Sequence, residues 1–95
     1  MPAPDTDCQF VVTFGLTVRH LREQHGWSQE VLAERADLNR SYVGELERGK
    51  AIPSVLTLKK LAGALDLSLT NLMAHTERRL QNGLVQGIKL TSIAC

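Results

Sequence analysis

The chain has 95 residues, 43% of them hydrophobic and 22% charged, which is the composition of one ordinary globular domain. Its formal net charge of +1 excludes a protein that binds nucleic acid through bulk positive charge alone. Aromatic residues make up only 4% of the chain, so we expect an aliphatic core and no base-stacking platform for single strands.

The two ends of the chain differ in pattern from its middle. Residues 1–8 hold two prolines and two aspartates and show no apolar period, which predicts a flexible arm. Residues 9–80 have helical periodicity and no lasting alternation, which predicts a single all-α domain without strands. Residues 81–95 are apolar for a free tail, so we expect them to extend a dimer interface, as helix, strand or loose segment.

Apolar residues recur at three- and four-residue spacing in five segments, which predicts five short helices. These helices are expected over about Gln9–His25, Gln29–Ala36, Arg40–Arg48, Ser54–Leu65 and Leu69–Leu80. Gly26 and Gly49 are C-terminal stops, and Ser28, Asn39 and Ser68 are N-cap types. The expected inward positions are Phe10, Phe14, Val18, Leu21, Val31, Leu32, Ala36, Val43, Leu46, Leu58, Leu61, Ala62, Leu65, Leu69, Leu72, Met73 and Leu80.

The second and third helices carry the pattern of a helix-turn-helix. A turn of three residues joins them, Asp37 stands where the turn needs a special backbone conformation, and Ala33 is small enough for a close helix crossing. Leu38 follows as the hydrophobic residue after the turn, and Val43 and Leu46 face inward on the third helix. This pattern alone is shared by many helical pairs, so the surrounding residues decide its meaning.

The surrounding residues that carry a family pattern are Arg22, Gly26-Trp27-Ser28-Gln29, Leu32-Ala33, Leu46-Glu47-Arg48-Gly49-Lys50, Pro53, Leu58, Leu61-Ala62 and Leu65. Together they resemble the Cro/repressor family of DNA-binding domains, also called the XRE family. The resemblance covers Phe14 to Ala74, about two thirds of the chain, and within the family the stretch Arg40–Gly44 is most similar to the small controller proteins of restriction-modification systems.

The resemblance implies a compact five-helix, repressor-like fold whose third helix lies in the DNA major groove, where base edges can be distinguished. The implied base-contacting residues are Arg40, Ser41, Gly44 and Glu45. The implied DNA backbone contacts are Gln29, Asn39, Tyr42, Arg48, Lys50 and Ser54. The structural alternatives stay open: exposed polar residues of a helix, a plain first-turn glutamine, or a tyrosine that packs between helices.

The resemblance also implies a partly buried ion pair between Arg22 and Glu47, which would join the first helix to the third. Asp37 departs from the family, which usually has glycine at this turn position. Aspartate tolerates the left-handed region better than most residues, so we expect the fold to be kept.

One recognition helix reads too few base pairs for useful specificity, so we expect a homodimer on a pseudopalindromic operator. The candidate interface is the fifth helix with help from the tail, namely Leu69, Thr70, Asn71, Met73, Leu84 and Val85. The neutral total charge conceals a local excess of +3 over residues 39–60, from Arg40, Arg48, Lys50, Lys59 and Lys60 against Glu45 and Glu47.

The leading hypothesis is therefore a sequence-specific transcription regulator, acting on double-stranded DNA and autoregulating a restriction-modification or similar operon. The alternative is an antitoxin or protein-binding adaptor that represses its own operon as a second task. RNA polymerase or a toxin is the candidate protein partner, and we expect no small-molecule effector, cofactor, catalytic residue or metal site. The sequence shows no membrane span or secretion signal, which favours a cytoplasmic, nucleoid-associated protein of bacterial or phage type.

Overall fold

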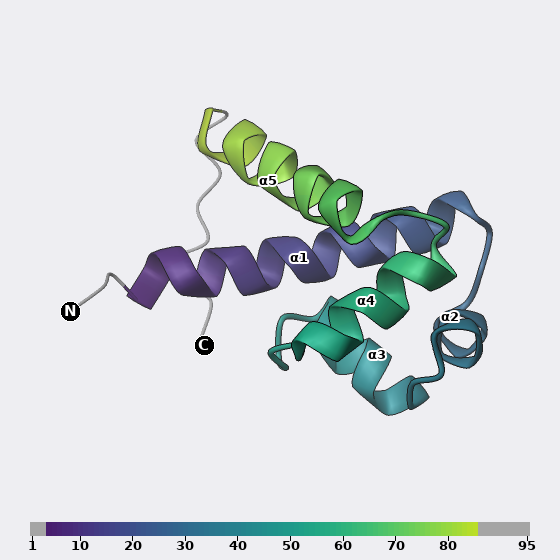
Figure 1. The fold of residues 1–95 in the computed structure, drawn as a ribbon. Helices are drawn as coiled ribbons and strands as arrows, with labels where there is room; N and C mark the ends of the chain where they lie inside the picture. Colours follow the sequence, from purple (N-terminus) through teal and green to yellow (C-terminus); the bar gives the residue numbers. More distant parts are fainter. Residues whose placement is uncertain (1–3, 86–95) are drawn as a thin grey trace.

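The structure, a computed structural model, describes the backbone of residues 4–85 and the side chains of residues 8–82. Within these residues it contains helices and no strand, so the predicted all-α class is confirmed. The helices are α1 (Pro4–Gln24), α2 (Gln29–Ala36), α3 (Arg40–Glu47), α4 (Val55–Ala64) and α5 (Leu69–Val85). The long α1 runs through the middle of the molecule, with α5 along one side and α2, α3 and α4 on the other (Figure 1). No helix in the described part is long and apolar enough to cross a membrane.

The two outer helix ends differ from the prediction. The expected flexible arm over residues 1–8 is wrong in part, because α1 already begins at Pro4. Proline has no N–H to leave unpaired and is therefore tolerated in the first turn of a helix. The expected end of the last helix at Leu80 is also wrong, since α5 continues past Gly83 to Val85. The rest of the predicted tail, residues 86–95, lies outside the described residues.

The core is mostly aliphatic, as expected, with Phe14 as the aromatic member of its buried cluster, and every helix contributes to it. Helix α1 packs against α3 and α5, and α2 and α5 each pack against α4. The buried apolar cluster consists of Phe14, Val18, Leu21, Leu32, Ala33, Ala36, Val43, Leu46, Leu61, Ala62, Leu65 and Leu72. Phe10 and Leu69 were expected inside and are instead 36% and 37% exposed. Leu69 is the first residue of α5 and Phe10 lies toward the N-terminal end of α1, so each is flanked by less of its own helix than the central core positions are.

Four helices end in the same way, although the residues at their ends differ. A backbone N–H two or three residues past each helix reaches back five residues to a carbonyl, as in Trp27 N to Arg22 O at 3.2 Å and Leu38 N to Ala33 O at 2.8 Å. This six-to-one bond needs a left-handed residue just before it. The residues in that conformation are Gly26, Asp37, Gly49 and Asp66, with φ between 55° and 74°. The chain therefore turns tightly after α1, α2, α3 and α4, which fixes how the site helices are presented.

Candidate nucleic-acid interface

Helices α2 and α3 form the predicted helix-turn-helix, and a local hydrogen bond caps the N-terminus of each helix. The Ser28 hydroxyl accepts a hydrogen bond from the Val31 N–H at 3.1 Å, and the Asn39 carboxamide oxygen accepts one from Ser41 at 2.8 Å. Between the two helices Asp37 has φ 55° and ψ 51°, the left-handed conformation that the turn requires. These caps satisfy backbone donors that each helix would otherwise leave unpaired.

The inner face of α3 lies directly on α1. Gly15 of α1 is so close to the last turn of α3 that a Cβ atom there would be 2.9 Å from the Glu47 carbonyl oxygen. Val43 and Leu46 are 0% and 1% exposed in the same contact. Because backbone meets backbone at this crossing, the position of α3 relative to the rest of the domain is fixed.

An ion pair closes this contact. Arg22 of α1 donates to both carboxylate oxygens of Glu47, from Nε at 2.7 Å and from Nη2 at 3.0 Å, and both residues are buried. Its third nitrogen, Nη1, donates to the Trp27 carbonyl at 2.8 Å, so the guanidinium also holds the α1–α2 turn. The hydrogen bond to Glu47 raises the pKa of Arg22 against the opposing effect of burial, so Arg22 stays charged at every ordinary pH.

Gln29 extends this network from the core to the surface. Its amide nitrogen donates to Glu47 Oε1 at 2.9 Å, the oxygen that Arg22 Nη2 also approaches. The sequence could not indicate this bond, because 18 residues separate its partners. One of the amide donors that a DNA phosphate would use is therefore already committed. The side-chain oxygen of Gln29 faces the other way, toward Gly44, at 3.3 Å from where a Cβ atom of that residue would be.

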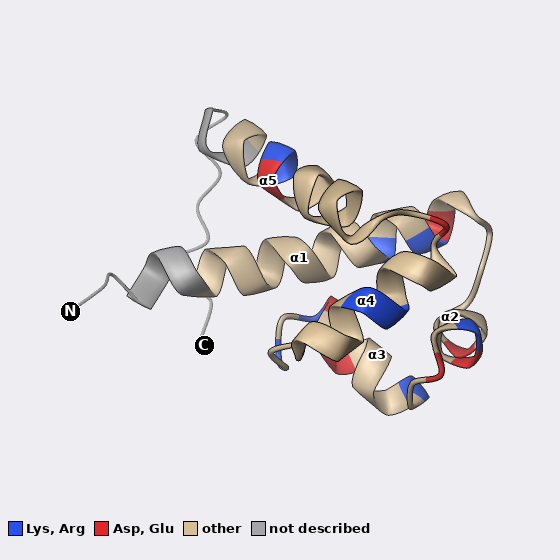
Figure 2. Ribbon diagram, viewed as in Figure 1, with Lys and Arg blue, Asp and Glu red and all other residues tan. Residues whose placement is uncertain are grey.

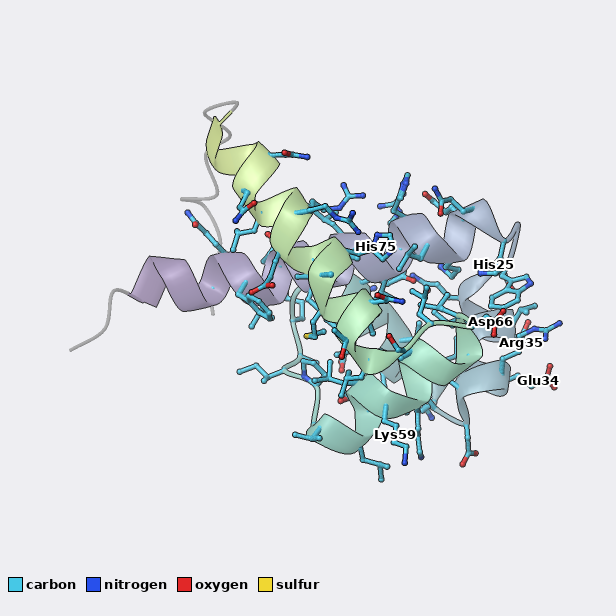
Figure 3. The ribbon with its side chains drawn as sticks, turned by 45° about the horizontal axis from the view of Figure 1, so that its top comes forward. His25, Glu34, Arg35, Lys59, Asp66 and His75 are labelled. Carbon is cyan, nitrogen blue, oxygen red and sulfur yellow. The ribbon has the colours of Figure 1, made fainter. Side chains whose placement is uncertain are left out.

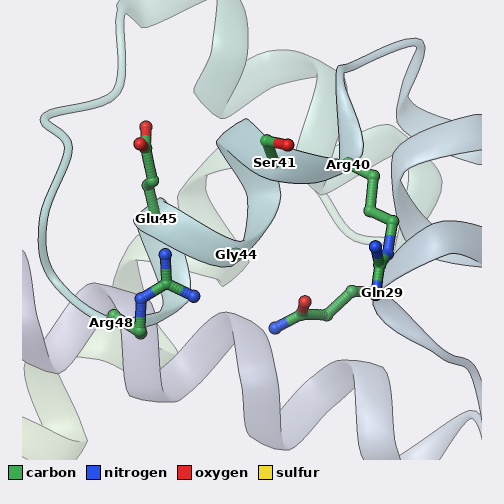
Figure 4. Close-up of a pocket in the computed structure, with 6 residues that line it drawn as sticks. All are labelled: Gln29, Arg40, Ser41, Gly44, Glu45 and Arg48. Carbon is green, nitrogen blue, oxygen red and sulfur yellow. The ribbon is translucent and has the colours of Figure 1, made fainter.

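The outer face of α3 is an open hollow of about 390 Å³ lined by Gln29, Arg40, Ser41, Gly44, Glu45 and Arg48. All four residues with an implied base-contacting role therefore line one surface (Figure 4). Arg40 and Arg48 come from opposite ends of α3, and both are exposed. In the part of the chain that the structure describes, neither guanidinium has a hydrogen bond or an ion pair, so their donors are available to a ligand.

The residues with an implied DNA backbone role do not all have free polar groups. Asn39 and Ser54 are exposed, but their side-chain oxygens already cap α3 and α4. Tyr42 is half-buried against the core, and its hydroxyl lies 3.4 Å from the Thr57 hydroxyl, which favours the packing alternative. Lys50 is exposed, just past the end of α3. Like Arg48, Lys50 has no hydrogen bond or ion pair from its charged group to a described residue, so that group is available to a DNA phosphate.

Positive charge gathers around this surface in spite of the neutral total. Basic residues mark the start of α3, the loop after it and α4, while acidic residues lie on α2 and late in α3 (Figure 2). Glu47, one of those acidic residues, is buried and bound to Arg22. Of the described side chains in the hollow, Glu45 alone is acidic, against Arg40 and Arg48. The exposed charge of the face is therefore more positive than the formal count suggests.

Other polar groups gather away from the hollow. The His25 and Trp27 rings stack at 4.2 Å between centroids, and the Arg35 guanidinium lies 4.5 Å from the Trp27 ring centroid. His25 and Arg35 lie together at one end of the molecule, apart from His75 (Figure 3). Among the described residues no group of three or more His, Cys, Asp or Glu could hold a metal ion.

The candidate dimer residues all belong to α5, and Leu69 shares a helix face with the buried Leu72 and Thr76. Thr70 and Asn71 are exposed, Leu69 is 37% exposed and Met73 is half-buried. Leu84 and Val85 belong to α5, but their side chains lie outside the described residues. The described candidates thus leave polar and apolar surface on one stretch of α5.

A tightly capped helix pair, with a buried ion pair behind α3 and two arginines on its outer face, defines a helix-turn-helix domain of the DNA-binding type. The family model described as helix-turn-helix matches residues 18–72, and the chain belongs to this family.

Known proteins of this type are similar to the chain over most of its described length. The immunity repressor protein of Bacillus phage phi105 is 36% identical over 67% of this chain, which spans only 44% of that repressor. The control protein C.MunI of a Mycoplasma species is 34% identical over 70% of this chain and 92% of its own length. The crystal structure of the restriction-modification controller protein C.AhdI from Aeromonas hydrophila is 47% identical, with a TM-score of 0.64 over 65% of this chain and 94% of that protein.

Proposed function

We propose that the protein is a sequence-specific DNA-binding transcription regulator that acts as a homodimer on an inverted-repeat operator. Its similarity to C.AhdI and C.MunI favours control of a restriction-modification operon as the regulated function. The proposal assigns a binding role and not a catalytic one. Contact with RNA polymerase or a toxin stays a prediction.

The observation that carries the proposal concerns two guanidinium groups, Arg40 and Arg48, on the outer face of a rigidly held α3. Neither has a hydrogen bond or ion pair to a described residue. A helix of this size fits the major groove, and an arginine can donate two hydrogen bonds to the O6 and N7 of guanine. The inner face supplies what such a reader needs, because the Gly15 contact and the Arg22–Glu47 pair fix the helix before DNA arrives.

The dimer part of the proposal rests on α5. Leu69 and Met73 leave apolar surface next to the exposed Thr70 and Asn71, and this stretch lies on a helix that already packs against α1. A two-fold contact there would present two α3 helices to one duplex. The half-sites of such an operator lie about 34–36 Å apart, or one helical turn of DNA.

Selection of bound sequences from random duplex DNA tests both parts at once. We expect an inverted repeat with half-sites one turn apart, and a guanine in each half-site that depends on Arg40. Arg40→Ala should relax the preference at that base pair, at a cost of about 1–3 kcal/mol in binding free energy. Lys50→Ala should weaken binding to every sequence alike and reduce the salt dependence by about one unit of slope.

Two results would contradict the proposal. Recovery of no common motif would mean that the protein does not read sequence. Equal loss of affinity on every sequence for Arg40→Ala and Lys50→Ala would mean that Arg40 contacts the DNA backbone and not a base.

A further inference from the structure

Gly44 has an unusual place for a glycine, since it is in the middle of α3 with an ordinary helical backbone. It is buried, although α3 exposes this face, because the side chains of Gln29 and Arg48 cover it. A Cβ atom at position 44 would lie 3.2 Å from Arg48 Nη1 and 3.3 Å from Gln29 Oε1. Because Gly44 has no side chain, these two groups can lie close to the helix at this position.

The consequence for Arg48 is a change of direction. Its backbone stands at the C-cap of α3, yet its guanidinium turns back over the preceding turn of the helix, toward Gly44 (Figure 4). A residue at the end of the recognition helix normally reaches the phosphates at the edge of the groove. This guanidinium instead lies over the middle of the face that would enter the groove.

Two further features keep Arg48 in this position with its charge available. Gln29 cannot swing away freely, because its amide nitrogen is bound to the buried Glu47 carboxylate. Its oxygen thus offers a fixed partial negative charge beside the arginine. Glu45 lies on the same helix face but forms no ion pair with Arg48 in the described part of the chain.

We propose that Arg48 is a second residue of the site that contacts a base. We also propose that Gly44 determines specificity, because its missing side chain leaves room for the Arg48 guanidinium above the middle of α3. The inference rests on the proposed function and replaces the DNA backbone role that the resemblance implied for Arg48. Two guanidiniums then converge on the hollow from opposite ends of α3. Each half-site contains two guanine contacts, one made by Arg40 and one by Arg48.

The test compares motifs selected from random duplex DNA by the wild type and by Arg48→Met, Gly44→Ala, Arg19→Met and Gly63→Ala. Arg48→Met should lower discrimination at one base pair per half-site by about 5- to 150-fold, and should leave the base pair read by Arg40 unchanged. Gly44→Ala should lose preference at the same base pair as Arg48→Met, because the added methyl group displaces the guanidinium.

The controls separate reading from folding. Arg19 is an exposed arginine of α1 paired with Glu23, and Gly63 is a helical glycine with nothing within 4 Å of an added Cβ atom. Arg19→Met and Gly63→Ala should therefore select the wild-type motif. The melting temperature should not fall in Gly44→Ala, since alanine is the better helix former and the nearest atom that its methyl group meets is the end of the flexible Arg48 side chain.

The outcomes are distinct. If Arg48→Met weakens binding to all sequences equally and leaves the motif intact, Arg48 is a backbone contact and the inference is wrong. If Gly44→Ala keeps the base pair that Arg48→Met loses, the role of Gly44 is wrong. If the wild type selects no motif, the proposed function itself fails.

Discussion

The charged groups on the two faces of α3 differ in whether other residues of the protein bind them. On the inner face Glu47 is buried, and its carboxylate is bound by Arg22 and Gln29. On the outer face Arg40 and Arg48 are exposed and make no such bond in the described residues. The eight-residue helix α3 thus lies between a carboxylate that is bound inside the protein and two guanidinium groups that are exposed to a ligand.

The glycines on the two faces differ in the same sense. Gly15 allows the backbone of α1 to meet the backbone of α3, which cannot move aside. Gly44 instead leaves room for the side-chain ends of Gln29 and Arg48, and the Arg48 guanidinium, which has no hydrogen bond within the described residues, can shift. The comparison indicates that the inner face sets stability and the outer face sets recognition, so substitutions on each should affect different measurements.

The largest expected effect is on the inner ion pair. Glu47→Ala leaves the Arg22 guanidinium buried without its charge partner, which should lower the free energy of unfolding by about 3–5 kcal/mol. Urea unfolding followed by the fluorescence of Trp27, the single tryptophan, measures this directly.

A matched surface pair provides the control. Arg19 and Glu23 form an ion pair at 3.2 Å with both side chains more than half exposed, so Arg19→Ala should change the free energy of unfolding by less than about 1 kcal/mol. Replacing both inner partners, as in Arg22→Met with Glu47→Leu, should recover stability relative to Glu47→Ala alone, because no charge is stranded. Identical unfolding curves for Glu47→Ala and the wild type would refute the structural role of the pair.

A smaller but still destabilising effect is expected at Gly15. Gly15→Ala places a methyl group against the Leu46 and Glu47 carbonyls, which would force α1 away from α3 at a cost of about 1–3 kcal/mol. Gly63→Ala makes the same chemical change in open space and should instead gain up to about 1 kcal/mol from helix propensity. Opposite signs in urea unfolding would support the comparison, and a stabilised Gly15→Ala would show that the helix crossing is looser than described.

The sequence predicted the helix-turn-helix well because its signals are local. Ser28 and Asn39 cap helices as expected, and Gly26 and Gly49 have the left-handed conformation at helix ends. The outer ends of α1 and α5 were predicted less well. Pro4 and Gly83 are residues that often end a helix, but each is compatible with one. The packing of α1 on α5 favours the longer helices that the structure shows.

The site was predictable as a set of residues but not as a network. The family resemblance implied one DNA-facing side for Arg40, Ser41, Gly44 and Glu45, and in the structure all four line one hollow. The bond from Gln29 to Glu47 depends on how α2 and α3 are packed, which no short pattern encodes. The direction of Arg48 had a faint signal in sequence, namely a glycine four residues before an arginine in a helix, and its meaning needs the position of Gln29.

The smallest expected effect concerns the turn that joins the two site helices. Asp37 and Asp66 both have left-handed backbones, with φ 55° and 62°. Glycine adopts this conformation without strain, whereas an L-residue there lowers the free energy of unfolding by about 1 kcal/mol. Asp66→Gly should therefore stabilise the protein slightly. Asp37→Gly should gain less, because the Asp37 carboxylate also lies 3.7 Å from Lys60 Nζ and that weak contact is lost.

Both substitutions are remote from the hollow lined by Arg40 and Arg48, so the selected DNA motif should stay the same. Urea unfolding and motif selection on the same two variants check this together. If Asp37→Gly altered the motif without altering stability, the turn would belong to recognition, and the division between the two faces of α3 would have to include it.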